Sequence, residues 1–127
     1  VPDWLRGQME ALEEHTAAND RLSLWIAFDY GGRAEIVEAA RRLVADGIAV
    51  DDVDEEAFAT RLSAPELPDP DLLIRSSGEL RLSNFLLWQL AYTELVFTET
   101  LWPDFGGDDL REALGEYARR RRRYGGR

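Results

Sequence analysis

The sequence contains no cysteine, no lysine and no long apolar run, and each absence narrows the classes of protein it can encode. Without cysteine, the chain can form neither disulfide bonds nor thiolate metal sites. No stretch approaches the roughly 20 consecutive apolar residues of a membrane-spanning helix. The single histidine, His15, falls in a predicted helix among glutamates, which argues against a metal or triad role. We therefore expect a small globular domain, with the cytoplasm as the default compartment.

The charge balance argues against nucleic acid as a partner. The formal net charge is −10, whereas nucleic-acid binding needs a broad basic surface. All 15 basic residues are arginines, and five of them form one block at residues 119–123. This block either binds an anionic surface or is a solvated helix end that the helix macrodipole favours.

Hydrophobic periodicity predicts an alternation of helices and strands. Helices are expected at residues 3–18, 34–46, 54–62, 84–92 and 108–123. Apolar runs predict strands at residues 22–28, 72–74 and 94–98. This order predicts an α/β fold, with a parallel β-sheet flanked by helices and joined by right-handed crossovers. Three strands make a thin sheet with open edges, so we expect further strands upstream of this sequence.

Two arginines follow the predicted strand at 72–74, in the stretch LIRSSGELRLSNF. Ligands of α/β proteins bind beyond the carboxyl ends of parallel strands. There Arg75 and Arg81, with serine hydroxyls and turn amides beside them, could clamp a phosphate or diphosphate. Equally, both arginines could pair with carboxylates such as Glu79 and be structural. Spacing alone does not separate the two readings.

Two further positions suit the chemistry of a polyanion site. Glu94 stands at the entrance to the predicted strand at 94–98, where a carboxylate could hold magnesium or simply be solvated. The sequence DYGGR, at residues 29–33, predicts a tight turn in which Gly31 and Gly32 supply backbone freedom. Its amides could face an anion, or the segment could be only a turn.

Three segments together resemble the cis-prenyltransferases, the undecaprenyl diphosphate synthase family. The signature region of that family is similar to residues 70–105, PDLLIRSSGELRLSNFLLWQLAYTELVFTETLWPDF. A second family block is similar to DYGGRAEIVEAARRL, and the terminal arginine–aromatic–glycine motif to RRRRYGG. The resemblance covers essentially the whole chain and corresponds to the C-terminal half of the family's catalytic domain.

The resemblance implies an enzyme that condenses isopentenyl diphosphate with an allylic diphosphate, forms cis double bonds and needs Mg2+. It implies a homodimer, and contact with a membrane surface through the lipid product. By position, Arg75, Arg81 and Ser83 match residues that grip the diphosphate of isopentenyl diphosphate, and Glu94 matches a glutamate that helps hold magnesium. Arg123 and Gly125 match a motif that reaches the partner subunit's active site.

The sequence also departs from the family pattern. Asp29 stands where asparagine is more usual, and Leu80 where a polar residue is common. The family's aspartate-glycine-asparagine loop, which binds the allylic diphosphate, is not in this sequence, so no catalytic residue is identified. We expect residues 1–127 to be the C-terminal part of one catalytic domain, inactive alone. The alternatives are a non-catalytic partner subunit of a heteromeric enzyme, or an unrelated phosphate-binding module.

Overall fold

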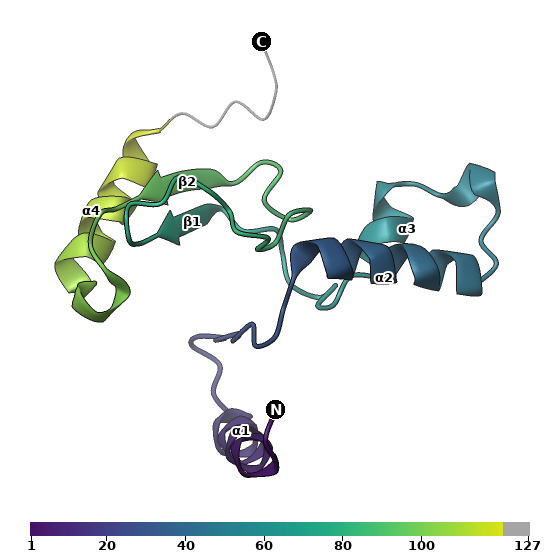
Figure 1. The fold of residues 1–127 in the computed structure, drawn as a ribbon, viewed down its shortest axis with the longest axis horizontal. Coiled ribbons are helices and arrows are strands. Elements are labelled where there is room, and N and C mark those ends of the chain that lie inside the picture. The colour runs from purple at the N-terminus through teal and green to yellow at the C-terminus, as the bar shows by residue number, and fades with distance from the viewer. Residues whose placement is uncertain (121–127) are drawn as a thin grey trace.

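A computed structural model describes residues 1–120. The helices and strands within this range, with two short 3-10 turns at Val50–Asp52 and Trp102–Asp104, are α1 (Asp3–Thr16), α2 (Gly32–Ala45), α3 (Glu55–Ala59), β1 (Leu72–Arg75), β2 (Glu94–Phe97) and α4 (Gly107–Arg119). In Figure 1, α3 lies against α2, α4 covers the β1–β2 pair, and α1 stands apart at the end of an extended segment. No helix in this range has the length and apolar character needed to cross a membrane.

The two strands form a parallel pair, which confirms the predicted α/β class. Leu72 is opposite Glu94 in the register, and Arg75 is opposite Phe97. Val96 of β2 is 5% exposed and Ala113 of α4 is 2% exposed. Packing of α4 against β2 removes the apolar surface of both elements from water and holds α4 on the strand pair.

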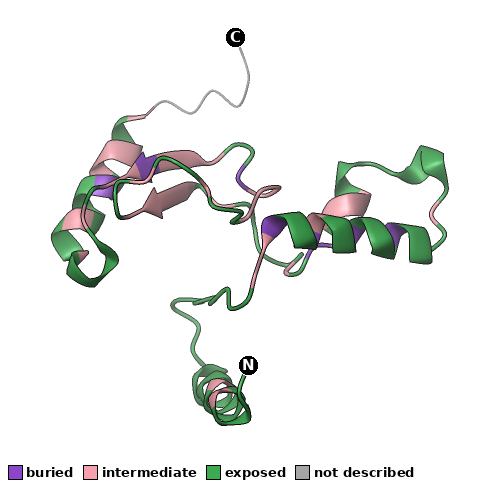
Figure 2. Ribbon diagram, in the orientation of Figure 1, coloured by how far each residue is buried: buried purple, intermediate pink, exposed green. Residues whose placement is uncertain are grey.

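Helix α2 contributes two of the four other buried apolar residues of the described range, beside Leu62 and Leu90. Ala39 and Leu43 are buried one turn apart, as expected for the inward stripe of an amphipathic helix. Figure 2 shows this stripe as purple segments along α2. Asp54 begins α3 by accepting a hydrogen bond from the Ala57 N–H at 2.7 Å, a normal N-cap. The ring of Phe58 on α3 packs on Trp88 with centroids 4.4 Å apart, tying α3 to the segment before β2.

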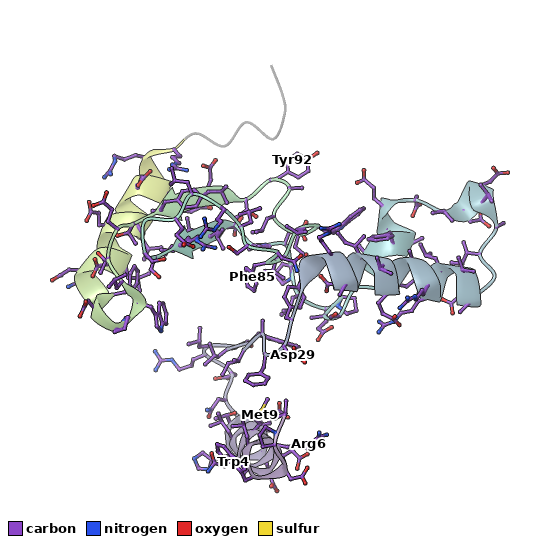
Figure 3. The ribbon with its side chains drawn as sticks, viewed as in Figure 1. Trp4, Arg6, Met9, Asp29, Phe85 and Tyr92 are labelled. Carbon is purple, nitrogen blue, oxygen red and sulfur yellow. The ribbon has the colours of Figure 1, made fainter. Side chains whose placement is uncertain are left out.

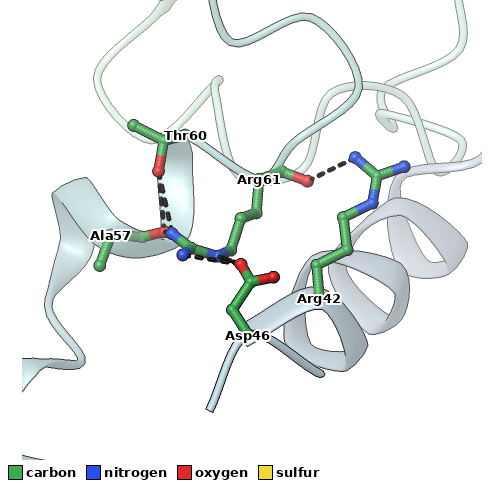
Figure 4. A network of polar contacts seen from close by, with 5 residues as sticks. All are labelled: Arg42, Asp46, Ala57, Thr60 and Arg61. Atoms are coloured by element: carbon green, nitrogen blue, oxygen red, sulfur yellow. Dashed lines mark hydrogen bonds and ion pairs between the residues drawn. The ribbon is translucent and has the colours of Figure 1, made fainter. Parts of the chain in front are cut away.

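Arg61 fastens α3 to the carboxyl end of α2 (Figure 4). Its guanidinium donates from Nε to Asp46 Oδ2 at 2.9 Å and from Nη1 to the Ala57 carbonyl at 2.6 Å. In return, Arg42 Nη1 donates to the Arg61 carbonyl at 3.1 Å. The network satisfies the Ala57 and Arg61 carbonyls at α3 and links this helix to Arg42 and Asp46 at the end of α2, so the α2–α3 pair is held by polar contacts as well as by its apolar stripe.

The predicted strand at 22–28 is wrong. These residues are irregular, and Leu24 and Ile26 are 76% and 68% exposed. A strand needs a neighbour for its N–H and C=O groups, and among residues 1–120 the only ladder joins β1 to β2. The apolar run therefore has the composition of a buried strand without a partner, and the described sheet has two strands instead of three.

The predicted helix at 84–92 is also wrong, because its backbone enters the left-handed region twice. Asn84 has φ 64° and Leu86 has φ 44°, conformations that a right-handed helix excludes. Isolated turns replace the helix, among them the bond from the Leu90 N–H to the Leu86 carbonyl at 3.0 Å. The apolar pattern was real, but it reflects packing of a looped segment against α2 and α3.

Helix α1 has no buried residue, and Trp4 is 67% exposed. Figure 3 shows Trp4, Arg6 and Met9 on α1, well separated from Phe85 and Tyr92 in the rest of the fold. The helix follows from its leucine, methionine and glutamate content and from entry through Pro2, whose fixed φ suits a helix start.

A buried carboxylate joins three segments that are distant in the sequence. Glu35 of α2 is 7% exposed and accepts hydrogen bonds from the Tyr30 hydroxyl, the Ser63 N–H at 2.9 Å and Gln89 Nε2 at 3.2 Å. Burial opposes its charged form, but these donors outweigh burial and lower the pKa of Glu35. Burial and the bond to Glu35 raise the pKa of Tyr30.

We expect Glu35 to make stability depend on pH. A carboxyl group whose pKa is lowered by folding stabilises the fold above its ordinary pKa of about 4.3, and this contribution is lost as the pH falls through the folded value. Replacing Glu35→Gln should reduce the free energy of unfolding at neutral pH by about 1–3 kcal/mol and flatten its decline in acid. Urea unfolding at pH 3 to 7 measures both. Glu38→Gln, on the exposed face of α2, is the control; equal behaviour of the two variants would contradict the assignment.

Candidate functional site

The loop after β1 is held by the segment that leaves β2. The Ser77 N–H donates to the Thr100 carbonyl at 2.9 Å, and the Gly78 N–H donates to the Thr98 carbonyl at 2.8 Å. Both loop residues are left-handed, with φ of 73° at Ser77 and 69° at Gly78. Their amides are therefore committed to the fold, and the expectation that turn amides take part in an anion clamp is not met by this pair.

Glu79 brings the two predicted arginines together. Arg75, the last residue of β1, and Arg81 each donate from Nη2 to one oxygen of the Glu79 carboxylate. The Arg75 side chain is 21% exposed and the Arg81 side chain 65%, so one guanidinium is anchored and the other reaches into solvent. Both arginines pair with Glu79, as the structural alternative predicts. Their guanidiniums also lie close together, which a phosphate clamp requires.

One N–H donor of the Arg75 guanidinium has no acceptor among the described residues. This donor is Nε, which is buried. A buried N–H without a partner is costly, and an arginine fork matches the geometry of a phosphate oxygen pair. The cluster of Arg75, Glu79 and Arg81 can thus accept an anion that competes with Glu79 for the two guanidiniums.

Asn84 caps the amino end of α2 from 51 residues away in the sequence. Its backbone carbonyl accepts from the Gly32 N–H at 2.7 Å, and its side-chain Oδ1 accepts from the Arg33 N–H at 2.8 Å. Gly31, the N-cap residue, has no side chain to do this. The N–H groups of Gly32 and Arg33 therefore donate to Asn84. Of the two alternatives for the DYGGR segment, this contact supports the one in which it is only a turn.

Close approach, not backbone freedom, explains the glycine pair. Gly31 has φ −151°, which any residue can adopt, so the predicted reason for it is wrong. A Cβ on Gly31 would lie 2.9 Å from Asn84 Nδ2, and a Cβ on Gly32 would lie 2.9 Å from Leu87 Cγ. Gly32 must stay small because backbone atoms of Asn84 and Leu87 also lie close to it, whereas a Cβ on Gly31 would displace only the end of the Asn84 side chain.

The structure also shows the conformation or exposure of three other positions that the sequence analysis singled out. Ser83 is exposed, with φ 51°, one residue before Asn84. Asp29 has φ 54°, a left-handed conformation that aspartate and asparagine both tolerate, so its backbone role is compatible with the family's asparagine. Leu80 is 79% exposed beside the arginine pair. Arg123 and Gly125 lie outside the described residues.

Glu94 lies at the opposite end of the strands from the arginines. It is the first residue of β2, as predicted, and its Oε2 accepts from Arg120 Nη1 at 2.9 Å. The same Arg120 nitrogen donates to the Leu95 carbonyl at 2.8 Å, and Nη2 donates to Glu116. Hydrogen bonds to Glu94 and Glu116 raise the pKa of Arg120. Three residues of strand, about 10 Å, separate Glu94 from the level of Arg75.

The described residues do not by themselves fit a magnesium ion. Magnesium prefers an octahedral set of oxygens, often one or two carboxylates with substrate phosphates and water. Within residues 1–120, no three acidic or histidine side chains are grouped to hold a metal. Glu94 is one carboxylate and is already paired with Arg120. Its assignment to magnesium stays a prediction.

The residues that support the site were missed by sequence reasoning. Asn84, Glu35 and Arg120 make the contacts that position the loops, yet each lies 26 or more residues from a partner. The only available signal was Asn84 itself, an asparagine that directly follows the candidate clamp and is suited to a left-handed bend. Its partner on α2 is not visible from spacing.

The fold and the cluster of Arg75, Glu79 and Arg81 together define a class of protein. They describe an α/β protein whose paired arginines lie at the carboxyl end of a parallel strand, where such folds bind anions. Residues 1–125 match the family model described as "Putative undecaprenyl diphosphate synthase". The chain belongs to this family of isoprenyl transferases.

Relatives with about 50% sequence identity support this family assignment. The isoprenyl transferase of Fusobacterium nucleatum is 51% identical over 126 residues, covering 99% of this chain and 54% of that protein. A ditrans,polycis-undecaprenyl-diphosphate synthase from Xanthomonas axonopodis pv. citri, named as (2E,6E)-farnesyl-diphosphate specific, is 53% identical over 125 residues, covering 95% of this chain and 49% of that protein.

The structural comparison supports the fold. The crystal structure of lavandulyl diphosphate synthase from Lavandula x intermedia, in complex with dimethylallyl diphosphate, is similar with a TM-score of 0.92 and 44% identity. The match covers 98% of this chain and 56% of that one. The chain spans about half the length of the curated relatives that it matches.

The glycine contacts predict a marked effect of a single methyl group. Gly32→Ala should reduce the free energy of unfolding by about 1–3 kcal/mol, because its Cβ would overlap Leu87 Cγ and approach the Leu87 nitrogen at 3.1 Å. Gly7→Ala is the matched control, since a Cβ there meets nothing within 4 Å. It should stabilise α1 slightly. Urea unfolding compares the two, and equal effects would refute the packing argument.

Proposed function

We propose that this chain takes part in cis-prenyl transfer and supplies the grip on the diphosphate of isopentenyl diphosphate. The observation that carries the proposal is the convergence of Arg75 and Arg81 on the single carboxylate of Glu79. The family assignment supports it, as do relatives named as undecaprenyl-diphosphate synthase and lavandulyl diphosphate synthase. The second substrate is an allylic diphosphate.

The proposed reaction explains why arginines are needed. The C–O bond of the allylic diphosphate breaks and diphosphate leaves. The alkene of isopentenyl diphosphate forms the new carbon–carbon bond, and one proton is lost as the cis double bond forms. Two polyanions must be held in line for this step, and fixed cations lower the cost of bringing them together.

Glu79 is the residue that prepares the clamp in this proposal. Without a substrate, its carboxylate keeps the two guanidiniums close and offsets their mutual repulsion. A diphosphate carries more charge and more acceptor oxygens than one carboxylate, so it can displace Glu79 and accept from the Nη2 groups of Arg75 and Arg81. Exposed Ser83 can add a hydroxyl donor.

We also propose that residues 1–127 are the C-terminal part of a single catalytic domain. The shared length with relatives, about half of each, supports this, as does the exposed apolar segment at 22–28. On this proposal the allylic site comes from residues outside the chain. The protein works as a homodimer, with Arg123 and Gly125 reaching the partner's site.

Removing the anchored arginine tests the clamp directly. In the full-length protein, Arg75→Ala should weaken binding of isopentenyl diphosphate by about 1.5–3 kcal/mol, because a charge-assisted hydrogen bond is lost. The measurement is the KM for isopentenyl diphosphate in a labelled-substrate assay. Arg111→Ala is the control, an exposed arginine on α4 that pairs only with Asp108 among its described contacts. An unchanged KM for Arg75→Ala would remove the basis of the proposal.

The magnesium role of Glu94 is tested by a pair of variants that share one partner. Glu94 and Glu116 both accept from Arg120. If Glu94 binds magnesium, Glu94→Gln should raise the half-saturating magnesium concentration severalfold, because a carboxylate ligand becomes a neutral amide. Glu116→Gln should not, although it disturbs the same arginine. Equal shifts in magnesium titrations would assign Glu94 to the ion pair alone.

A further inference from the structure

We infer that Asn84 is a positioning residue that sets where Arg81 and Ser83 meet the substrate diphosphate. The inference rests on the proposed clamp and adds a residue that does not touch the ligand. Its basis is the juxtaposition of Asn84, directly after Ser83, with the first two amides of α2. The geometry makes the start of α2 the support on which the clamp loop is built.

The clamp loop is fastened at both of its ends. At its start, the amides of Ser77 and Gly78 donate to the segment after β2, at 2.9 and 2.8 Å. At its end, Asn84 accepts two hydrogen bonds from α2, at 2.7 and 2.8 Å. Arg81 lies between these two attachments, and its own side chain is mostly exposed. The attachments therefore place the backbone of Arg81, while its guanidinium is held by the ion pair with Glu79.

Asparagine suits this position for two separate reasons. The φ of Asn84 is 64°, in the left-handed region that asparagine adopts more readily than most residues. Its side chain also supplies an acceptor that the α2 N-cap residue, Gly31, lacks. The positive end of the helix dipole strengthens both bonds. A change at Asn84 therefore removes an anchor without removing a ligand of the diphosphate.

A second contact keeps the following segment on α2. Gln89 Nε2 donates to Glu35 Oε2 at 3.2 Å, and the ring of Phe85 packs edge-on against Tyr30 at 5.8 Å between centroids. These contacts lie beyond the loop, so losing the Asn84 side-chain bond should shift the loop exit without detaching the segment. The expected result is altered substrate binding in a folded protein.

Asn84→Gly is the sharpest test, because glycine keeps the left-handed backbone and the backbone carbonyl and loses the side-chain amide with its acceptor Oδ1. In the full-length protein, we expect the KM for isopentenyl diphosphate to rise roughly three- to tenfold, the effect of one hydrogen bond. The KM for the allylic substrate should not change. Asn84→Asp keeps the acceptor and should stay close to the wild type. Equal KM values in Asn84→Gly and the wild type would overturn the inference.

The matched control removes a helix cap elsewhere. Asp54→Gly deletes the acceptor for the Ala57 N–H on α3, at 2.7 Å, and should lower the urea midpoint without changing either KM. A rise in the KM for isopentenyl diphosphate in Asp54→Gly would mean that general loss of stability is being measured, which would overturn the inference. If Asn84→Gly does not fold, Gly31→Ala displaces the Asn84 amide from the other side and should raise the same KM.

A double-variant comparison separates this inference from the proposed function. Because Asn84 acts through the loop that carries Arg81, the effect of Asn84→Gly should largely disappear when Arg81 is already alanine. Additive effects would overturn the positioning role and leave the clamp intact. If Arg75→Ala also leaves the KM unchanged, the proposed function itself fails.

Discussion

The first N–H groups of a helix have no acceptor within the helix, and at α2 this need is met by Asn84. The contact joins the beginning of α2 to the loop that follows the arginine pair. It also explains the glycines at 31 and 32, since any side chain there would occupy the space that Asn84 and Leu87 fill. One capping interaction thus constrains a helix start, a glycine pair and a left-handed bend.

The buried carboxylate of Glu35 extends the same attachment one turn further along α2. Its donors come from the turn before the helix, from the loop after α3 and from the segment before β2. Because a buried charge is stable only when its lone pairs are satisfied, these segments cannot separate without a large cost. The polar contacts determine the relative placement of loops that the small apolar core would leave loosely fixed.

Sequence patterns predicted the elements whose determinants are local. The helix at α2, the strands at Leu72 and Glu94, and the arginine pair were all readable from spacing. The apolar run at 22–28 was misread because a strand depends on a neighbour, which residues 1–120 do not supply. The left-handed bend at Asn84 and the separation of Glu94 from Arg75 depend on contacts distant in sequence, so periodicity could not reveal them.

The overall charge of the chain bears on how the proposed clamp could bind an anion. An acidic chain, with a net charge of −10, repels anions at long range, so anion binding must rely on short-range, oriented donors. In the proposed clamp, Arg75 and Arg81 meet that need when the loop that carries Arg81 is held in place, because ordering a free loop on binding costs backbone entropy. Attachment at Ser77 and at Asn84 reduces that backbone cost, so in this proposal the support of the clamp matters as much as its cations.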